Sequence, residues 1–389
     1  MTTTLVTNIG QLVTGRLGAP VLTDTSLSIE DGVITAVGED LPSPDRVVDA
    51  VGLSVFPGFV DGHVHPTFGE WTPAQDSIGW IGNYLQGGTT SMVSAGELHV
   101  PGLQFDELDP ELVLGLAYLS RATTGRMRPS GVKVHAGTVL LVPGLTERDF
   151  DRMVERGLKH LKFIFYNWNK APVGEAQEYV RWARERDMVV KLHSGGVSRS
   201  GSSRIAGHEV VTEVGPDVVA HMSGGPIPMP DADIPRVIDD LPDAAFEICS
   251  SMNYRSTQVV VDHLTRRGRL DALTLGTDTP GGTGVIPRGM LRNMCFLASV
   301  CGMDPADAVA AATGNTALRH RIAGGLLEVG QPADLVVLGP VTGSTGTNAL
   351  ECLALGDLPG ISVVMVDGEP LVAGRSQQTP PPLRLATLS

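Results

Sequence analysis

The sequence has little of what marks secreted or membrane-spanning proteins. Its four cysteines show no paired C-x-x-C spacing, so neither a disulfide framework nor a paired-cysteine metal site is expected. No apolar run approaches the roughly 18 residues that a transmembrane helix needs. The first residues carry no basic segment ahead of an apolar stretch, as a secretory signal would. We therefore expect a cytoplasmic protein with reduced thiols.

Positive charge and aromatic residues are also scarce. The chain of 389 residues has 29 Lys and Arg against 43 Asp and Glu, a net charge of −14, and only 5% aromatic residues. Such a negative charge disfavours nucleic acid and anionic membranes as partners. The hydrophobic share of 42% is ordinary for a globular protein, and the length allows a large core or two domains. We expect a small-molecule substrate and a homo-oligomer, either a dimer or a tetramer.

The most informative segment that is present is FPGFVDGHVHP, in which His63 and His65 close an apolar run. This run, broken at Pro57-Gly58, predicts a buried strand. Alternate residues of a strand point to the same side, so the two imidazoles form half of a possible metal site. An isolated His-x-His would more readily be a polar strand end. Here comparable residues recur along the chain.

The middle of the chain repeats a strand followed by a helix. Steps of about 30 residues or more are typical of βαβ units, and about eight of them match a (β/α)8 TIM barrel. Helices are expected over 146–157, 174–187 and 304–315, with Thr146 and Asp149 as a capping box, Asp304 as an N-cap and Gly314 as the end of the last. A doubly wound sheet would need a glycine-rich phosphate turn, which FVDGHVH is not. The predicted strands end near Val64, Ala95, His135, Phe165, His193, His221, Cys249 and Asp278.

Both ends of the chain read instead as short strands with hairpin turns at Asp31-Gly32 and Asp367-Gly368. Neither end has enough strand for a stable sheet alone, so we expect the two to pair. The prediction is a small β-sandwich domain built from 1–56 and 325–389, with the catalytic barrel over 57–324.

Ligand-type side chains stand at the predicted strand ends, where a barrel of this kind carries its active site. Any one of them alone would more readily be structural, but together they indicate a metal centre. Lys162 is costly to bury as a cation, and its neutral amine could take up CO₂ to give a carbamate that bridges two metals. The alternatives are that Lys162 reaches solvent or pairs with an acid. The proposed ligands are His63, His65, Lys162, His193, His221 and Asp278.

Weaker candidates surround this set. His135 ends the third strand and His99 follows the second, so either could bind substrate. Arg288, on a loop expected at the mouth, could hold a substrate carboxylate. Trp168 and Tyr254 could supply an apolar wall for a planar ring.

The phrases FPGFVDGHVHP, LHSGG, AHMSGG and LGTDTPGGTG, with the strand-end lysine, resemble the amidohydrolase superfamily over nearly the whole chain. GVKVHAG, GTGVIPRGMLRNM and GDLPGISVV are similar to the enamidases, hydrolases of cyclic amides, within it. Enamidase-like proteins can also use a glutamate as the bridging ligand, which leaves a glutamate as the alternative to Lys162.

The resemblance implies two divalent metals, zinc first and Fe²⁺ or Mn²⁺ next, bridged by hydroxide and carboxylated Lys162. His63, His65 and Asp278 would hold the more buried metal, and His193 and His221 the other. Asp278 would also take the proton of the attacking hydroxide and pass it to the leaving nitrogen.

The predicted reaction is hydrolysis of a cyclic amide of the lactam or enamide type. The same scaffold could hydrolyse another amide, an ester or an N-acyl compound. A deaminase is less favoured, since neither His193 nor His221 has a Glu three residues on. A non-catalytic scaffold would have lost ligands, and all six positions are filled here.

Overall fold

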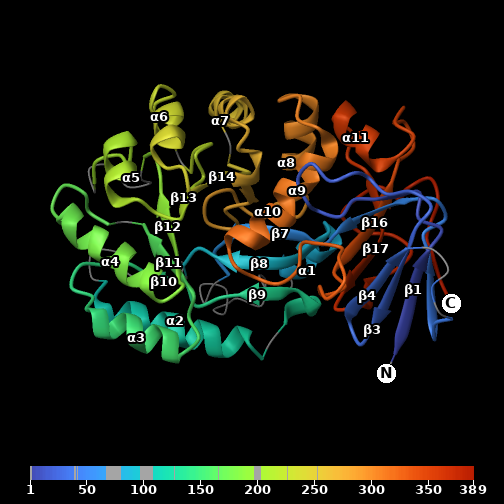
Figure 1. Ribbon diagram of the computed structural model, residues 1–389, viewed down its shortest axis with the longest axis horizontal. Helices are drawn as coiled ribbons and strands as arrows, with labels where there is room; N and C mark the ends of the chain where they lie inside the picture. The colour runs from blue at the N-terminus through green and yellow to red at the C-terminus, as the bar shows by residue number, and fades with distance from the viewer. Residues whose placement is uncertain are drawn as a thin grey trace.

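The computed structural model describes residues 2–389 except 39–40, 42, 67–79, 97–107, 127, 165, 197–202, 226 and 252. Figure 1 shows two parts, a larger one in which helices surround parallel strands and a smaller one of sheets beside which both termini lie.

Parallel strands form the middle of the larger part, in a three-stranded sheet β7-β8-β9 and a six-stranded sheet that runs from β10 to β15 in chain order. Most of these strands are buried along their whole length, which explains why they read as apolar runs without alternation. Their bounds are β7 Phe59–Val64, β8 Thr89–Ser94, β9 Lys133–His135, β10 Val139–Leu140, β11 His160–Phe163, β12 Val189–His193, β13 Val218–Ala220, β14 Ala245–Cys249 and β15 Leu273–Gly276.

The last of these strands lies beside the first. The Asp278 amide donates to the His63 carbonyl at 2.8 Å, and the His65 amide donates to the Thr279 carbonyl at 2.7 Å. The third predicted strand ends at His135 as predicted, and a short strand that was not predicted, β10, follows it. β9 pairs with β8, whereas β10 pairs with β11. These pairings bring the carboxyl ends of β7 and β15 to one edge.

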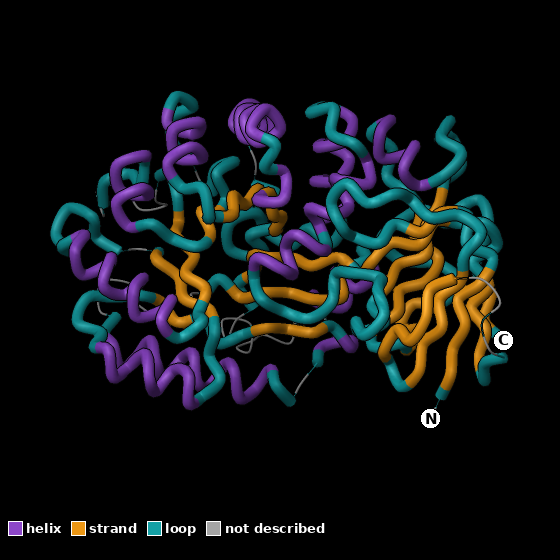
Figure 2. The backbone as a smooth tube through the Cα atoms, viewed as in Figure 1, coloured by secondary structure: helices purple, strands orange, loops and turns teal. Residues whose placement is uncertain are grey.

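Helices lie outside the strands (Figure 2). The predicted capping box is confirmed, as Asp149 accepts from both the amide and the hydroxyl of Thr146. Asp304 caps its helix as predicted, but Gly314 begins the next helix rather than ending this one, because the backbone breaks at Thr313. The helices are α1 Trp80–Gln86, α2 Pro110–Thr124, α3 Glu147–Glu155, α4 Val173–Glu185, α5 His208–Val214, α6 Asp233–Asp240, α7 Tyr254–Arg267, α8 Gly289–Ser299, α9 Pro305–Ala312, α10 Gly314–Arg319 and α11 Ala349–Leu355.

The smaller part consists of two five-stranded sheets, ordered β19-β5-β1-β3-β4 and β18-β17-β16-β6-β2. Each sheet joins strands from both ends of the chain, and a buried apolar cluster that includes Leu27, Val55 and Val337 also draws on both ends. Asp31 and Asp367 turn their hairpins with φ of 47° at each, as the Asp-Gly signals predict. The strands are β1 Thr3–Thr7, β2 Gln11–Leu12, β3 Ser26–Glu30, β4 Val33–Gly38, β5 Arg46–Asp49, β6 Ser54–Pro57, β16 Leu335–Gly339, β17 Gly360–Val366, β18 Glu369–Val372 and β19 Thr387–Leu388.

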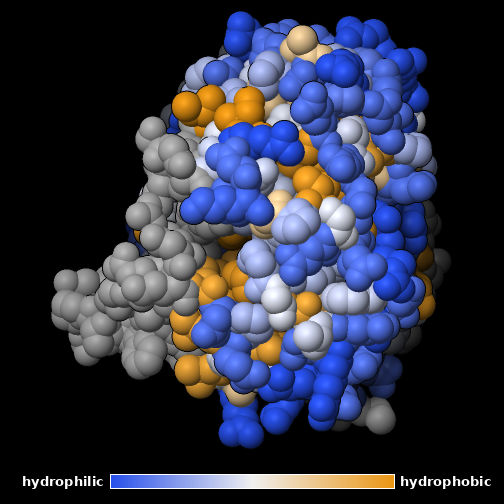
Figure 3. Space-filling model, turned by 90° about the vertical axis from the view of Figure 1, so that its left-hand side faces the viewer, coloured by the Kyte–Doolittle hydropathy of each residue, from blue (hydrophilic) through white to orange (hydrophobic). Residues whose placement is uncertain are grey.

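The visible surface is mostly hydrophilic (Figure 3), in keeping with the ordinary hydrophobic share of the sequence. Figure 3 looks onto the end of the molecule that carries α4 and α5, where hydrophilic residues dominate and apolar ones form small separate groups. Within the described ranges, none of the helices combines the length and apolar character that crossing a bilayer requires.

Candidate metal centre and adjoining pocket

The six predicted ligands lie at the ends of β7, β11, β12, β13 and β15, and all of them are buried. The Asp278 carboxylate Oδ1 lies 3.2 Å from His65 Nε2 and 3.5 Å from His63 Nε2. Donor atoms of these three residues lie within 4.8 Å of one another, a spacing that could hold a metal ion.

The other three residues adjoin this group. Lys162 Nζ lies 3.4 Å from His63 Nε2. The ring of His221 is centred 5.2 Å from that of His63 and 4.5 Å from that of His193. The structure therefore brings all six predicted residues into one buried cluster.

The ring nitrogens are arranged as metal ligands require. His65 Nδ1 lies 2.7 Å from the Gly96 carbonyl, and His193 Nε2 lies 2.9 Å from the Gly196 carbonyl, so each ring has one nitrogen held by backbone. Among the described residues, the buried Nδ1 atoms of His193 and His221 have no hydrogen-bond partner. Buried polar atoms are rarely left unsatisfied, and a metal ion would satisfy both.

Two of these residues adopt a backbone conformation that is uncommon for residues other than glycine. His221 has φ of 34° and Asp278 has φ of 60°, in the left-handed region that non-glycine residues seldom adopt. His221 directly follows β13, which ends at Ala220, and Asp278 lies two residues after β15, which ends at Gly276. Strain of this kind gathers at functional sites, where it aims a side chain.

The charges of the cluster also suit metal binding. Burial lowers the pKa of His193 to about 4 and holds the pKa values of His63 and His221 below their usual range, so these rings are neutral at pH 7. Burial works to raise the pKa of Asp278, but the interactions with His63, His65 and Lys162 outweigh it and lower that pKa to about 2. Burial and the nearby Lys191 ammonium lower the pKa of Lys162 to about 7.

Sequence reasoning missed two charged residues beside the cluster, Lys191 in β12 and Glu247 in β14. Glu247 Oε1 lies 2.5 Å from His63 Nδ1, and its Oε2 lies 2.6 Å from Lys191 Nζ. A signal was available. Lys191 stands two residues before His193 in the apolar run VVKLH, and a strand therefore turns both side chains to the same side.

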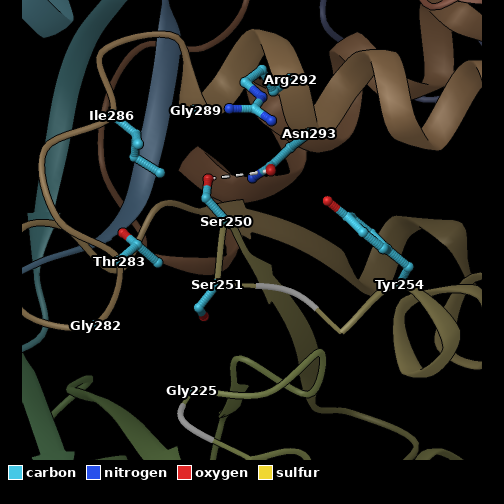
Figure 4. A pocket seen from close by; sticks show the side chains of 10 residues that line it. All are labelled: Gly225, Ser250, Ser251, Tyr254, Gly282, Thr283, Ile286, Gly289, Arg292 and Asn293. Atoms are coloured by element: carbon cyan, nitrogen blue, oxygen red, sulfur yellow. Dashed lines mark hydrogen bonds between the residues drawn. The ribbon is translucent and has the colours of Figure 1, made fainter.

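A pocket of about 410 Å³ adjoins the cluster (Figure 4). Polar groups line it, among them Tyr254, Arg292 and Ser250, whose hydroxyl is 3.2 Å from the amide oxygen of Asn293. Gly282 lines the pocket too, and a Cβ built on it would stand 2.0 Å from Asp278 Oδ2. Any side chain at position 282 would collide with this oxygen of Asp278, so the glycine lets the pocket wall pack directly against Asp278.

The residues that were weaker candidates for binding substrate lie in different environments. Tyr254 lines the pocket, whereas Trp168 packs in the core with its ring 4.6 Å from that of Tyr166. Arg288 is exposed at the start of α8, and Arg292, one turn on, lines the pocket instead.

Of the two histidine candidates for substrate binding, the structure describes only His135. His135 ends β9, and the charged groups that act on its pKa, His160 and Lys133 foremost, stand outside the cluster. His99 lies outside the described residues.

The amidohydrolase family matches residues 169–371. An enamidase of Eubacterium barkeri is 38% identical over a 392-residue alignment that covers 100% of each chain. The chain belongs to the amidohydrolase family. The solved structure of an enamidase superposes with a TM-score of 0.92 at 37% identity, again over 100% of both chains. The predicted resemblance to the superfamily and to enamidases is thus confirmed.

More distant members share less with the chain. An imidazolonepropionase of Salinispora arenicola is 33% identical over 153 residues, 37% of this chain and 34% of its own. A zinc complex of a mutant atrazine chlorohydrolase of Arthrobacter aurescens has a TM-score of 0.66 at 17% identity and covers 97% of each chain, a likeness of fold alone.

Proposed function

We propose that this amidohydrolase-family protein is a metal-dependent hydrolase that opens a cyclic amide of the lactam or enamide type at its C–N bond. One observation carries the proposal. His63, His65 and Asp278 converge in a buried cluster with an adjoining polar pocket, in a chain that aligns over its full length with an enamidase.

The metal set that we propose consists of two divalent ions, zinc first, with Fe²⁺ or Mn²⁺ as the alternatives. His63, His65 and Asp278 would hold one ion. His193 and His221, whose Nδ1 atoms have no partner among the described residues, would hold the other. Lys162, carboxylated on Nζ, would lie between the two ions.

A glutamate bridge is not favoured. Among the residues that the structure describes, Glu247 is the buried glutamate beside the cluster. Its two oxygens contact His63 Nδ1 and Lys191 Nζ, whereas Lys162 contacts the other ring nitrogen of His63. The Lys162 amine faces Nε2, the nitrogen that also faces Asp278. This arrangement supports Lys162 as the bridging residue.

Divalent ions bound here would supply a water acidic enough to attack at neutral pH and would polarise the amide carbonyl. Asp278 then moves the proton. Its Oδ1 contacts His65 and His63, while its Oδ2 is turned to Gly282 at the pocket wall. From that position Oδ2 can accept the proton of the attacking water and return it to the leaving nitrogen.

The architecture that accompanies this proposal is a closed (β/α)8 TIM barrel over 57–324. The hydrogen bonds between the ends of β15 and β7 support closure, as do the eight strand positions obtained when β9 and β10 count as one. We further propose a β-sandwich from 1–56 and 325–389, a homo-oligomer, and a cytoplasmic location. The four cysteines, all free, are in keeping with a reducing compartment.

A substrate screen of metal-analysed protein tests the function. We expect about two divalent ions per chain, and ring-opened product from a lactam, imide or hydantoin. Chelation should abolish turnover and added zinc should restore it. Release of ammonia without ring opening would identify a deaminase instead. Full activity in a preparation without transition metal would overturn the proposal.

A further inference from the structure

The carboxylate of Glu247 contacts Nδ1 of His63, which is one of the proposed metal ligands. Its Oε1 lies 2.5 Å from His63 Nδ1 and accepts a second, longer hydrogen bond of 3.3 Å from the His221 amide. Glu247 is fully buried in β14, while His63 and His221 belong to the β7 and β13 ends of the cluster. One side chain thus touches a proposed ligand of each ion.

Lys191 holds Glu247 in turn. Its Nζ lies 2.6 Å from Glu247 Oε2 and donates, also at 2.6 Å, to the carbonyl of Gly62, the residue before His63. Lys191 is 3% exposed, so the pair sits in the protein interior. The ammonium therefore fixes the carboxylate and the backbone beside His63 together.

The stability of the fold does not by itself explain a buried ion pair between Lys191 and Glu247. Removing two charges from water costs several kcal/mol per ion, and well-packed apolar residues often serve a fold equally well or better. The contact with His63 supplies a better reason. A carboxylate on Nδ1 fixes the proton there, so Nε2 presents its lone pair, and it also fixes the ring plane.

We propose that Glu247 and Lys191 are positioning residues for His63: Glu247 sets its tautomer and ring orientation, and Lys191 keeps Glu247 in place. The inference rests on the proposed function, since it assigns His63 Nε2 to a metal ion. Partners of this kind on a ligating histidine change metal affinity by about 10- to 100-fold when they are removed.

Glu247→Gln is the first test, because it keeps the shape of the side chain and removes its charge. We expect zinc affinity, measured by competition with a chelator, to fall by about 10- to 100-fold, and the visible spectrum of the cobalt-loaded protein to change. Asp334→Asn is the matched control. Asp334 is a buried carboxylate 2.8 Å from Lys133 Nζ that contacts none of the six proposed ligands. Its variant should keep wild-type zinc affinity and spectrum.

Glu247→Gln alone would leave the Lys191 ammonium buried without its carboxylate, which could prevent folding. The double variant Glu247→Gln/Lys191→Met removes both charges and avoids this problem. We expect its zinc affinity to stay at least about 10-fold below wild type. Wild-type affinity in either Glu247 variant would overturn the inference while leaving the proposed metal centre intact. An equal loss in Asp334→Asn would also overturn it, by showing a general loosening of the fold. A wild-type protein that binds none of zinc, Fe²⁺ and Mn²⁺ would overturn the proposed function and this inference with it.

Discussion

At the scale of single residues, Asp278 has two oxygens in different surroundings. Oδ1 faces two imidazoles, and Oδ2 packs against Gly282, a residue of the pocket wall. The left-handed backbone at Asp278, with φ of 60°, holds the side chain in this orientation. One oxygen is thereby suited to a metal ion and the other to a proton.

The variant Asp278→Asn separates these two tasks. The amide keeps an oxygen for the metal but cannot accept a proton, so we expect turnover to fall by at least ~10²-fold. Metal content, measured on the same preparation, should be largely retained at the His193 and His221 site. Turnover near wild type would show that another residue moves the proton.

Lys162 and Lys191 form a natural pair for comparison, because they face each other in register on β11 and β12. Lys191 has Glu247 as a counter-ion, whereas Lys162 lies against the neutral ring of His63. A carbamate on Lys162 would replace a buried cation with an anion that matches two dications. The tertiary structure thus distinguishes two lysines that look alike in sequence.

We expect Lys162→Ala to bind less than the full metal complement and to be inactive. Acetate or propionate should restore part of its activity by filling the vacated bridge, and should restore none in Lys191→Ala. Metal analysis and turnover with and without added carboxylate give the answer. If Lys162→Ala retains two ions and full activity, Lys162 does not bridge.

At the scale of elements, the start of α3 depends on a single carboxylate. Asp149 accepts from the Thr146 amide at 2.9 Å and from its hydroxyl at 2.8 Å. Asp149→Ala removes both bonds, and losing a cap of this kind costs about 1 kcal/mol of unfolding free energy. Urea unfolding measures the change. Turnover at a temperature where both proteins are folded should not change, and a large loss of turnover would contradict the separation of α3 from the site.

The predicted elements succeeded where local signals were strong. The Thr146–Asp149 capping box and the Asp31 and Asp367 turns depend on residues within a few positions of one another, and all three occur. The short strand β10, which follows β9 and pairs with β11, was missed. It depends on which neighbouring strand this segment pairs with, and no short window of sequence carries that information.

At the scale of the whole molecule, partly buried histidines make stability depend on pH. Burial lowers the pKa of both His135 and His160 to about 4, below the usual 6.5. Between these values the unfolded chain binds more protons than the folded protein. The unfolding free energy should therefore fall as the pH drops from about 7 toward 4.

His160→Gln tests this dependence, since glutamine can still donate toward the His320 carbonyl that lies 2.9 Å from His160 Nε2. We expect the variant to lose less unfolding free energy than wild type between pH 7 and pH 5, as measured by urea unfolding at each pH. An identical pH slope in the two proteins would mean that His160 does not contribute.

From the sequence alone we could predict the family, the alternation of strands and helices in the middle of the chain, and the six residues that gather in the cluster. Each of these depends on local pattern: apolar runs set the strands, and the ligand types stand where those runs end. Parallel strands that share one edge then bring their ends together, so knowing the strand ends was enough to name His63, His65, Lys162, His193, His221 and Asp278.

The surroundings of those six residues could be seen only in the tertiary structure. Glu247 joins His63 to Lys191 across three strands that are far apart in the chain, and Arg292 rather than Arg288 lines the pocket. Such contacts depend on how strands register and on which way a helix turns its side chains. Those properties are set by packing between distant segments, and the pattern of any one segment does not contain them.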